Sequence, residues 1–107
     1  MTESFVKVAL VTEVANGHGM KVFVNNKSVA LFRVDDRFFA TQNTCPHLGA
    51  SLHCGKIEGA KLTCPDHDWT FSLETGRMPM NPDCSLLLYD VEVRGDEVWV
   101  SRLARLS

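Results

Sequence analysis

The segments Cys45-Pro46-His47 and Cys64-Pro65-Asp66-His67 decide how the rest of this 107-residue chain is interpreted. Together they read C-x-H, then sixteen further residues, then C-x-x-H. Each segment supplies one thiol and one imidazole, and in each a proline follows the cysteine. Proline fixes φ and removes a backbone donor, which stiffens a loop. The pattern therefore predicts two rigid loops that present two cysteines and two histidines to one metal centre.

A [2Fe–2S] cluster with cysteines on one iron and histidines on the other fits this ligand set. Two anionic thiolates neutralise the charge of the oxidised core, whereas four thiolates would leave the site negative. Because an electron enters a neutral site more easily, histidine ligation raises the reduction potential. The imidazole N–H is also ionisable, so reduction can be coupled to proton uptake.

Two other kinds of site use the same residue types. A Cys2His2 zinc site is the main metal alternative, but zinc fingers usually place both cysteines in one short unit and both histidines in another. Here each unit is mixed, which disfavours zinc. A catalytic Cys–His pair is a further alternative, which the full four-residue arrangement disfavours more than zinc.

The apolar pattern outside these loops favours strands over helices. Apolar runs at 20–24 and 29–34 flank the polar segment 25–28, which predicts a hairpin. A turn at 35–37 leads to a strand at 38–41. A second hairpin is expected from 86–93 and 97–100 around Arg94-Gly95-Asp96, and the alternation at 91–93 predicts one buried face. No segment of the chain has convincing helical periodicity, so we expect an all-β domain.

The middle of the chain has a different composition. Residues 44–68 and 76–84 are rich in Gly, Pro, Cys and His, and segment 56–63 resembles a short hairpin that would bring the two loops side by side. Long loops in a compact domain are usually functional. The length of 107 residues fits one domain over 1–107.

Composition excludes several classes of partner. The formal net charge is −2 with 22% charged residues, which gives no electrostatic reason to expect nucleic acid or an anionic membrane. The N-terminus shows no secretory signal, and no run approaches the ~18 apolar residues of a membrane span. We therefore expect a cytoplasmic monomer whose cysteines are ligands or free thiols rather than a disulfide framework.

The motif residues resemble those of Rieske iron–sulfur proteins, and the resemblance extends over the whole chain. It is carried by Cys45-Pro46-His47-Leu48-Gly49, Cys64-Pro65-Asp66-His67, Phe71 and Thr75-Gly76. The resemblance implies an antiparallel β-sandwich with a two-loop cluster-binding subdomain at approximately 44–84. It also implies one [2Fe–2S] cluster, whose inner iron is bound by Cys45 and Cys64. By the same resemblance, His47 and His67 bind the outer iron near the surface.

Departures from the family pattern point to a low-potential branch. Respiratory Rieske proteins carry an extra cysteine in each loop, and the corresponding positions here are Ala50 and Asp66. They also place Ser and Tyr hydroxyls near the cluster sulfurs, where this chain has Trp69 and Phe71. Fewer hydrogen bonds to the sulfurs predict a potential towards the bottom of the range of roughly −150 to +300 mV. A soluble ferredoxin is therefore expected, not a quinol oxidase subunit.

Trp69, two places after His67, favours one group of these ferredoxins. With segments 75–76, 81–84 and 89–93 it resembles the ferredoxins of toluene and alkene monooxygenases. Those proteins pass electrons from an NAD(P)H-dependent flavin and iron–sulfur reductase to a diiron hydroxylase. We therefore predict an electron carrier that is no enzyme in isolation.

Three alternatives stay open at this stage. The first is the ferredoxin of a Rieske ring-hydroxylating dioxygenase, a group that more often has Gly directly after the second histidine. The second is a small subunit of a nitrite-reductase-type enzyme, against which the retention of all four ligand residues argues. The third is a zinc-stabilised binding module.

Residues beside the motif are candidates for a docking rim. Leu48, Trp69 and Pro82 could shield the cluster or contact a redox partner, although Trp69 could equally fill core volume. Cys54 and Cys84 lack the motif context and are interpreted as buried or incidental thiols, with a disulfide between them as the alternative. His53 lies near the first loop but not at a ligand position.

Overall fold

The computed structural model describes residues 4–45, 51–65, 69–78 and 81–105, and the side chains at 81–84 and 105 lie outside this description. Within these ranges the chain forms eleven strands and two short 3-10 helices, which confirms the all-β prediction. None of the described helices is long and apolar enough to cross a membrane.

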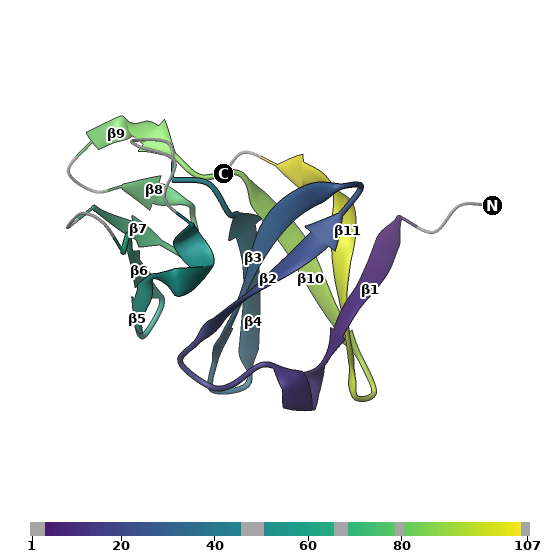
Figure 1. Cartoon of the computed structure of the whole chain (residues 1–107). Helices are drawn as coiled ribbons and strands as arrows, with labels where there is room; N and C mark the ends of the chain where they lie inside the picture. Colours follow the sequence, from purple (N-terminus) through teal and green to yellow (C-terminus); the bar gives the residue numbers. More distant parts are fainter. Residues whose placement is uncertain (1–3, 46–50, 66–68, 79–80, 106–107) are drawn as a thin grey trace.

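The strands form three antiparallel sheets, and Figure 1 shows the largest on one side of the molecule and the two small ones together on the other. The six-stranded sheet has the order β1 (Phe5–Leu10), β11 (Glu97–Arg105), β10 (Leu88–Arg94), β4 (Arg37–Gln42), β3 (Lys27–Val34), β2 (Gly19–Val24). The small sheets are β5 (Lys56–Glu58), β6 (Lys61–Thr63), β7 (Thr70–Ser72), and β8 (Arg77–Met78) with β9 (Asn81–Ser85). The 3-10 helices are η1 (Val11–Glu13) and η2 (Leu52–Cys54).

The predicted hairpins are present, and the first has a tighter turn than expected. Asn25 and Asn26 form a two-residue loop between β2 and β3 with φ of 51° and 65°. This left-handed pair is the geometry that two-residue hairpin loops require, and Asn tolerates it better than most residues. Lys27 and Ser28 therefore belong to β3 rather than to the turn. The second hairpin joins β10 to β11 through Gly95, whose φ is 63°.

The expected buried face of that second hairpin lies mostly on β11. Val98 and Val100 are fully buried, whereas Val93 is 46% exposed. Val93 lies one residue before the last pair, Arg94 with Glu97, next to the turn that joins the two strands. The alternation at 91–93 therefore identified a strand correctly but overstated how much of it is buried.

Strand β3 is buried on both faces and separates two cores. Val29, Ala30, Leu31 and Phe32 are all fully buried. Successive side chains of a strand point to opposite faces, and Val29 and Leu31 pack into one core while Ala30 and Phe32 pack into the other. Because both faces of β3 are covered, its sequence is a continuous apolar run and does not alternate between apolar and polar residues.

The first core lies within the six-stranded sheet and is aliphatic apart from Tyr89. Its buried members are Ala9, Val14, Val22, Val24, Val29, Leu31, Ala40, Tyr89, Val98 and Val100. The second core joins β3 to the small sheets and contains Ala30, Phe32, Cys45, Leu52, Leu62, Cys64, Phe71, Leu73, Met78 and Leu86. The two motif cysteines thus belong to the second core.

Helix η2 packs directly on the large sheet at Gly19. A Cβ atom at this glycine would lie 2.5 Å from the His53 carbonyl oxygen and 2.6 Å from the Phe32 ring. Only a residue without a side chain allows this approach. The contact fixes the segment that follows the first motif loop against β2 and β3.

Candidate metal centre

The two motif cysteines are buried, Cys64 directly after a strand and Cys45 three residues beyond one. Cys45 follows β4 and is 1% exposed, and Cys64 follows β6 and is 2% exposed. Both pack in the second core. Strand ends position side chains more rigidly than loop tips do, which suits a site whose geometry must be held.

Antiparallel contacts close the base of each loop. At the first loop Thr44 pairs with Ser51, and the Leu52 N–H donates to the Asn43 carbonyl at 2.6 Å. At the second loop the Cys64 N–H donates to the Trp69 carbonyl at 2.9 Å. The predicted hairpin at 56–63 is present as β5 and β6, so the two loop bases are linked through the sheet β5–β6–β7.

Two buried thiols in an apolar core are suited to binding a metal centre. A thiolate buried without a counter-charge is costly, and coordination to iron removes that cost. Among the described residues, no group of three or more metal-ligating side chains lies close enough together to hold a metal ion. His47, His67 and Leu48 lie outside the described residues, so their predicted roles remain predictions.

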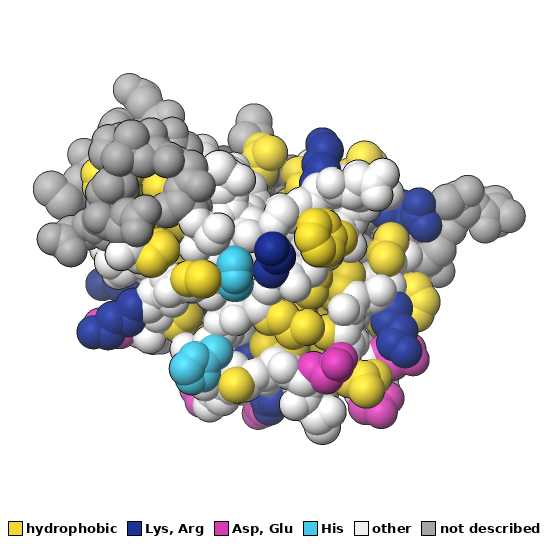
Figure 2. All heavy atoms as spheres, viewed as in Figure 1, with side chains coloured by type: hydrophobic (Ala, Val, Ile, Leu, Met, Phe, Trp, Pro, Cys, Tyr) yellow, Lys and Arg dark blue, Asp and Glu magenta, His cyan; other side chains and the backbone are white. Residues whose placement is uncertain are grey.

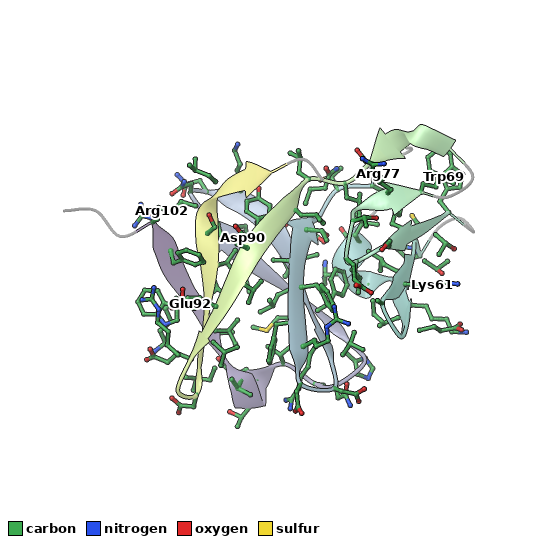
Figure 3. All side chains as sticks on the ribbon, turned by 180° about the vertical axis from the view of Figure 1, so that it is seen from behind. Lys61, Trp69, Arg77, Asp90, Glu92 and Arg102 are labelled. Atoms are coloured by element: carbon green, nitrogen blue, oxygen red, sulfur yellow. The ribbon has the colours of Figure 1, made fainter. Side chains whose placement is uncertain are left out.

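Trp69 packs beside the second core rather than standing free. Its ring is partly buried, lies 6.5 Å from the Phe71 ring at an interplanar angle of 55°, and contacts the core that holds the cysteines. Figure 3 shows Trp69 in the small half, far from Asp90, Glu92 and Arg102 on the large sheet. This packing supports the core-filling interpretation. A core-filling role is compatible with any redox partner, so Trp69 is weak evidence for a particular one.

Residues around Pro82 form a strand where an irregular loop was expected. The backbone of 81–85 is β9, which pairs with β8 through a register shift between Arg77 and Met78. Gly76, with φ of 75°, precedes β8 and accepts a hydrogen bond from the Leu86 N–H at 2.7 Å. The side chains of Pro82 and Cys84 lie outside the description.

Cys54 is exposed, so the expectation of a buried or incidental thiol is wrong as to burial. It lies at the end of η2, a helical turn held on the surface of the large sheet. His53 beside it is fixed by Asn43, which accepts its backbone N–H at 2.8 Å. The sequence had given no reason to single out Asn43, since its partner is ten residues away along the chain.

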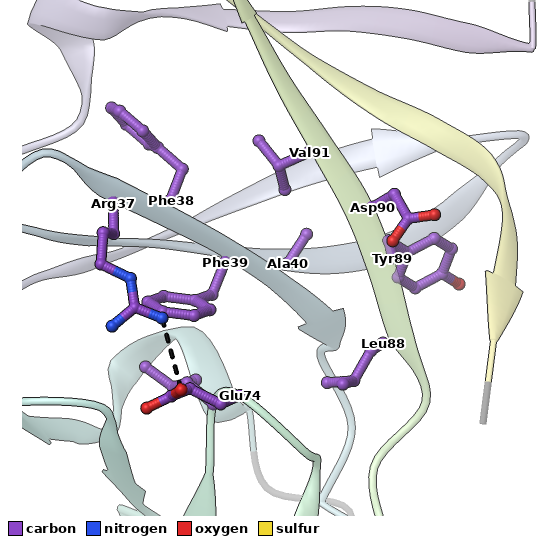
Figure 4. Close-up of a pocket in the computed structure, with 10 residues that line it drawn as sticks. Arg37, Phe38, Phe39, Ala40, Glu74, Leu88, Tyr89, Asp90 and Val91 are labelled. Atoms are coloured by element: carbon purple, nitrogen blue, oxygen red, sulfur yellow. Dashed lines mark ion pairs between the residues drawn. The ribbon is translucent and has the colours of Figure 1, made fainter. Parts of the chain in front are cut away.

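A pocket of about 330 Å³ lies between β4 and β10, with Leu73 and Glu74 of the small half at its edge (Figure 4). It forms because β10 pairs with β4 only at Leu88 and Tyr89, beyond which the two strands diverge. Arg37 bridges it with an ion pair to Glu74 at 3.5 Å, and burial raises the pKa of the Tyr89 phenol. Among the described residues, neither a cysteine nor a histidine lines this pocket.

Comparisons with known proteins agree with the motif. A family model described as the Rieske [2Fe-2S] domain matches residues 4–94. The naphthalene 1,2-dioxygenase system ferredoxin component of Pseudomonas aeruginosa is 32% identical over 94% of this chain and 97% of its own. The biphenyl dioxygenase ferredoxin subunit of Pseudomonas sp. strain KKS102 is 35% identical over 91% of each chain.

Solved structures give the same result. The ferredoxin of carbazole 1,9a-dioxygenase from Nocardioides aromaticivorans superimposes with a TM-score of 0.87 at 27% identity, covering 94% of this chain and all of that one. A ferredoxin in complex with the oxygenase of carbazole 1,9a-dioxygenase has a TM-score of 0.85 at 32% identity, covering 99% of this chain and 100% of that chain. A nitrite reductase small subunit from Mycobacterium tuberculosis, at 23% identity, shares the fold alone.

The ferredoxins among these relatives are components of dioxygenase systems. They agree better with the dioxygenase alternative of the sequence analysis than with its prediction of a monooxygenase component. The preference for a monooxygenase partner rested on Trp69, whose packing in the structure does not require any particular partner.

Proposed function

The chain belongs to the Rieske [2Fe-2S] domain family, and from this premise we propose that it carries single electrons to the oxygenase of a ring-hydroxylating dioxygenase system. The fold is the antiparallel Rieske fold, and the cofactor is one Rieske-type [2Fe–2S] cluster. The interpretation as a zinc-stabilised module is therefore wrong. The observation that carries the proposal is the near-full-length similarity to dioxygenase ferredoxin components.

Within this proposal, Cys45 and Cys64 bind one iron of the cluster, and His47 and His67 bind the other. The burial of both cysteines in one apolar core supports the first half of the assignment. The single Rieske domain spans 1–107, with a cluster-binding subdomain at approximately 44–84. The short strands β5 to β8 lie within that range and β9 ends one residue beyond it, as expected of a subdomain built around two loops.

The described residues fit an electron carrier whose cysteine ligands are shielded from water. When bound, the cluster supplies a one-electron redox couple. Apolar side chains from β3, β6 and β7 surround the cysteines and exclude solvent from their sulfur atoms. Phe71 is fully buried in this shell and has no hydroxyl to donate, which supports a potential low in the Rieske range.

The proposed partners are two proteins. A flavin-containing reductase supplies electrons, and an oxygenase component accepts them, as the solved oxygenase–ferredoxin complex illustrates for a similar chain. The formal charge of −2 suits transient contacts with basic patches on these partners.

A pre-reduced sample tests the partner class. The protein is reduced chemically and mixed in a stopped-flow instrument with the oxidised oxygenase of a Rieske dioxygenase or with a diiron hydroxylase. Reoxidation of the cluster is then followed optically. We expect fast, saturable electron transfer to the dioxygenase oxygenase. Saturable transfer to the diiron hydroxylase alone would instead support the monooxygenase alternative and overturn this proposal.

A further inference from the structure

Three side chains next to the first motif loop form a hydrogen-bonded relay that has no role in the proposed electron transfer. The Sγ atom of Cys54 lies 3.4 Å from Nε2 of His53. The other ring nitrogen, Nδ1, lies 3.1 Å from Oδ1 of Asn43. Cys54 is exposed, His53 is partly buried, and Asn43 is 4% exposed. The relay therefore runs from the surface into the protein.

The hydrogen bonds of Asn43 fix which ring nitrogen of His53 carries the proton. Its Oδ1 accepts the backbone N–H of His53 at 2.8 Å, so this atom is an acceptor and cannot be the amide nitrogen. Its Nδ2 donates to the Ser28 hydroxyl at 2.8 Å. An acceptor opposite Nδ1 requires an N–H there, and a neutral imidazole then carries its lone pair on Nε2. That lone pair faces the Cys54 thiol.

We propose that Cys54 is a base-assisted thiol that exchanges with low-molecular-weight disulfides such as oxidised glutathione. Nε2 of His53 takes the thiol proton, and Sγ attacks one sulfur of the disulfide. One S–S bond breaks as a new one forms, giving a mixed disulfide at Cys54. The departing thiolate recovers a proton and leaves as one free thiol, so no other oxidant is needed.

Exposure makes the exchange selective for this cysteine. Cys45 and Cys64 are 1% and 2% exposed, out of reach of a dissolved disulfide. Reactive cysteines combine access with a neighbouring base, and among the described cysteines Cys54 has both. Since η2 follows directly on the bridge that closes the first loop, the mixed disulfide would lie at the base of that loop.

The test uses the cluster-loaded protein and oxidised glutathione, with mass spectrometry to count and locate the adduct. We expect one glutathione per chain on Cys54. Cys54→Ser should abolish the adduct, and Cys84→Ser should retain it. His53→Gln should slow the reaction about ten-fold at pH 7 and leave it unchanged at pH 10, where thiols ionise without help. A merely structural histidine would not give this pH-dependent difference.

Equal rates for the wild type and His53→Gln at pH 7, or an adduct located on Cys84, would overturn the proposal. If the His53→Gln protein fails to keep its cluster spectrum, Asn43→Ala decides the question, because it removes the acceptor that orients the imidazole. It should slow adduct formation at pH 7, and an unchanged rate in a cluster-loaded Asn43→Ala protein would contradict the relay.

Discussion

The six-stranded sheet and the small sheets beside it differ in strand length and in the content of their cores. Strands of the large sheet have six to nine residues, whereas those of the small sheets have two to five. The core of the large sheet is almost entirely aliphatic. The core of the small sheets includes the two motif cysteines.

This difference indicates two sources of stability. Long, paired strands around an aliphatic core are stable without a cofactor, while short two- and three-stranded sheets are marginal in water. Binding of a metal centre contributes directly to folding free energy where its ligands belong to the core. We therefore expect the large sheet to act as a self-sufficient framework and the small half to depend on its cluster.

Loss of one ligand should produce the largest effect. Cys64→Ser removes a thiolate from the second core, and we expect loss of the cluster while the large sheet stays folded. Iron and sulfide content, together with the EPR spectrum of the reduced protein, measure the loss. Cys54→Ser is the matched control and should keep a normal cluster. A normal Rieske signal in Cys64→Ser would show that the ligand assignment is wrong.

A matched pair of leucines separates the two cores. Leu31 and Leu62 are both fully buried, the first in the large sheet and the second in the small half. Leu31→Ala should lower the free energy of unfolding by about 2–5 kcal/mol. Leu62→Ala should mainly accelerate cluster loss, measured as bleaching of the visible absorption under a chelator. Equal effects of both variants on global unfolding would break the distinction between the halves.

Gly19 tests the contact between the halves. Gly19→Ala places a Cβ against the His53 carbonyl and the Phe32 ring, which must move apart. We expect a loss of roughly 1–3 kcal/mol in denaturant unfolding, with faster cluster loss because η2 shifts. Lys21→Ala, at an exposed position of the same strand, is the control and should change little. A Gly19→Ala protein as stable as the control would show that η2 can move away from Gly19 without a loss of stability.

Phe71→Tyr should change the reduction potential of the cluster without lowering the stability of the large sheet. If the added hydroxyl reaches a cluster sulfur, one hydrogen bond of about 1 kcal/mol raises a one-electron potential by roughly 40 mV. Phe38→Tyr, beside the first core, should leave the potential unchanged. Redox titration followed optically measures both. An unchanged potential in a well-folded Phe71→Tyr protein would show that the missing hydroxyl at this position does not explain the low potential.

A surface carboxylate at the far end of the large sheet should give the smallest effect. Hydrogen bonds from Lys7 and then Trp99 hold the pKa of Glu97 below its ordinary value of 4.5. A lowered folded-state pKa stabilises the protein above the unfolded-state value, and this contribution is lost as pH falls through the folded-state value. Glu97→Gln should therefore be slightly less stable at pH 7. The difference from wild type should vanish in acid, and a difference that persists there would contradict the ion-pair account.

The sequence predicted the parts of the structure that depend on local signals. Turn residues such as Asn25 and Gly95 located the hairpins, and the two short motifs located the buried cysteines. The sequence did not reveal that β3 is covered on both faces, since this depends on two cores meeting there. The relay of Asn43, His53 and Cys54 was missed for a similar reason. Its residues are brought together by the bridge at the first loop, which no local pattern encodes.

Hydrogen exchange with and without the cluster tests most directly whether the small half depends on it. The amides of β3, β4, β10 and β11 should keep their protection when the cluster is removed, whereas those of β6 and β7 should exchange much faster. Mass spectrometry of peptides from each half measures both in one experiment. Equal loss of protection in both halves, or unchanged protection in β6 and β7, would contradict the division into a self-sufficient framework and a cluster-dependent half.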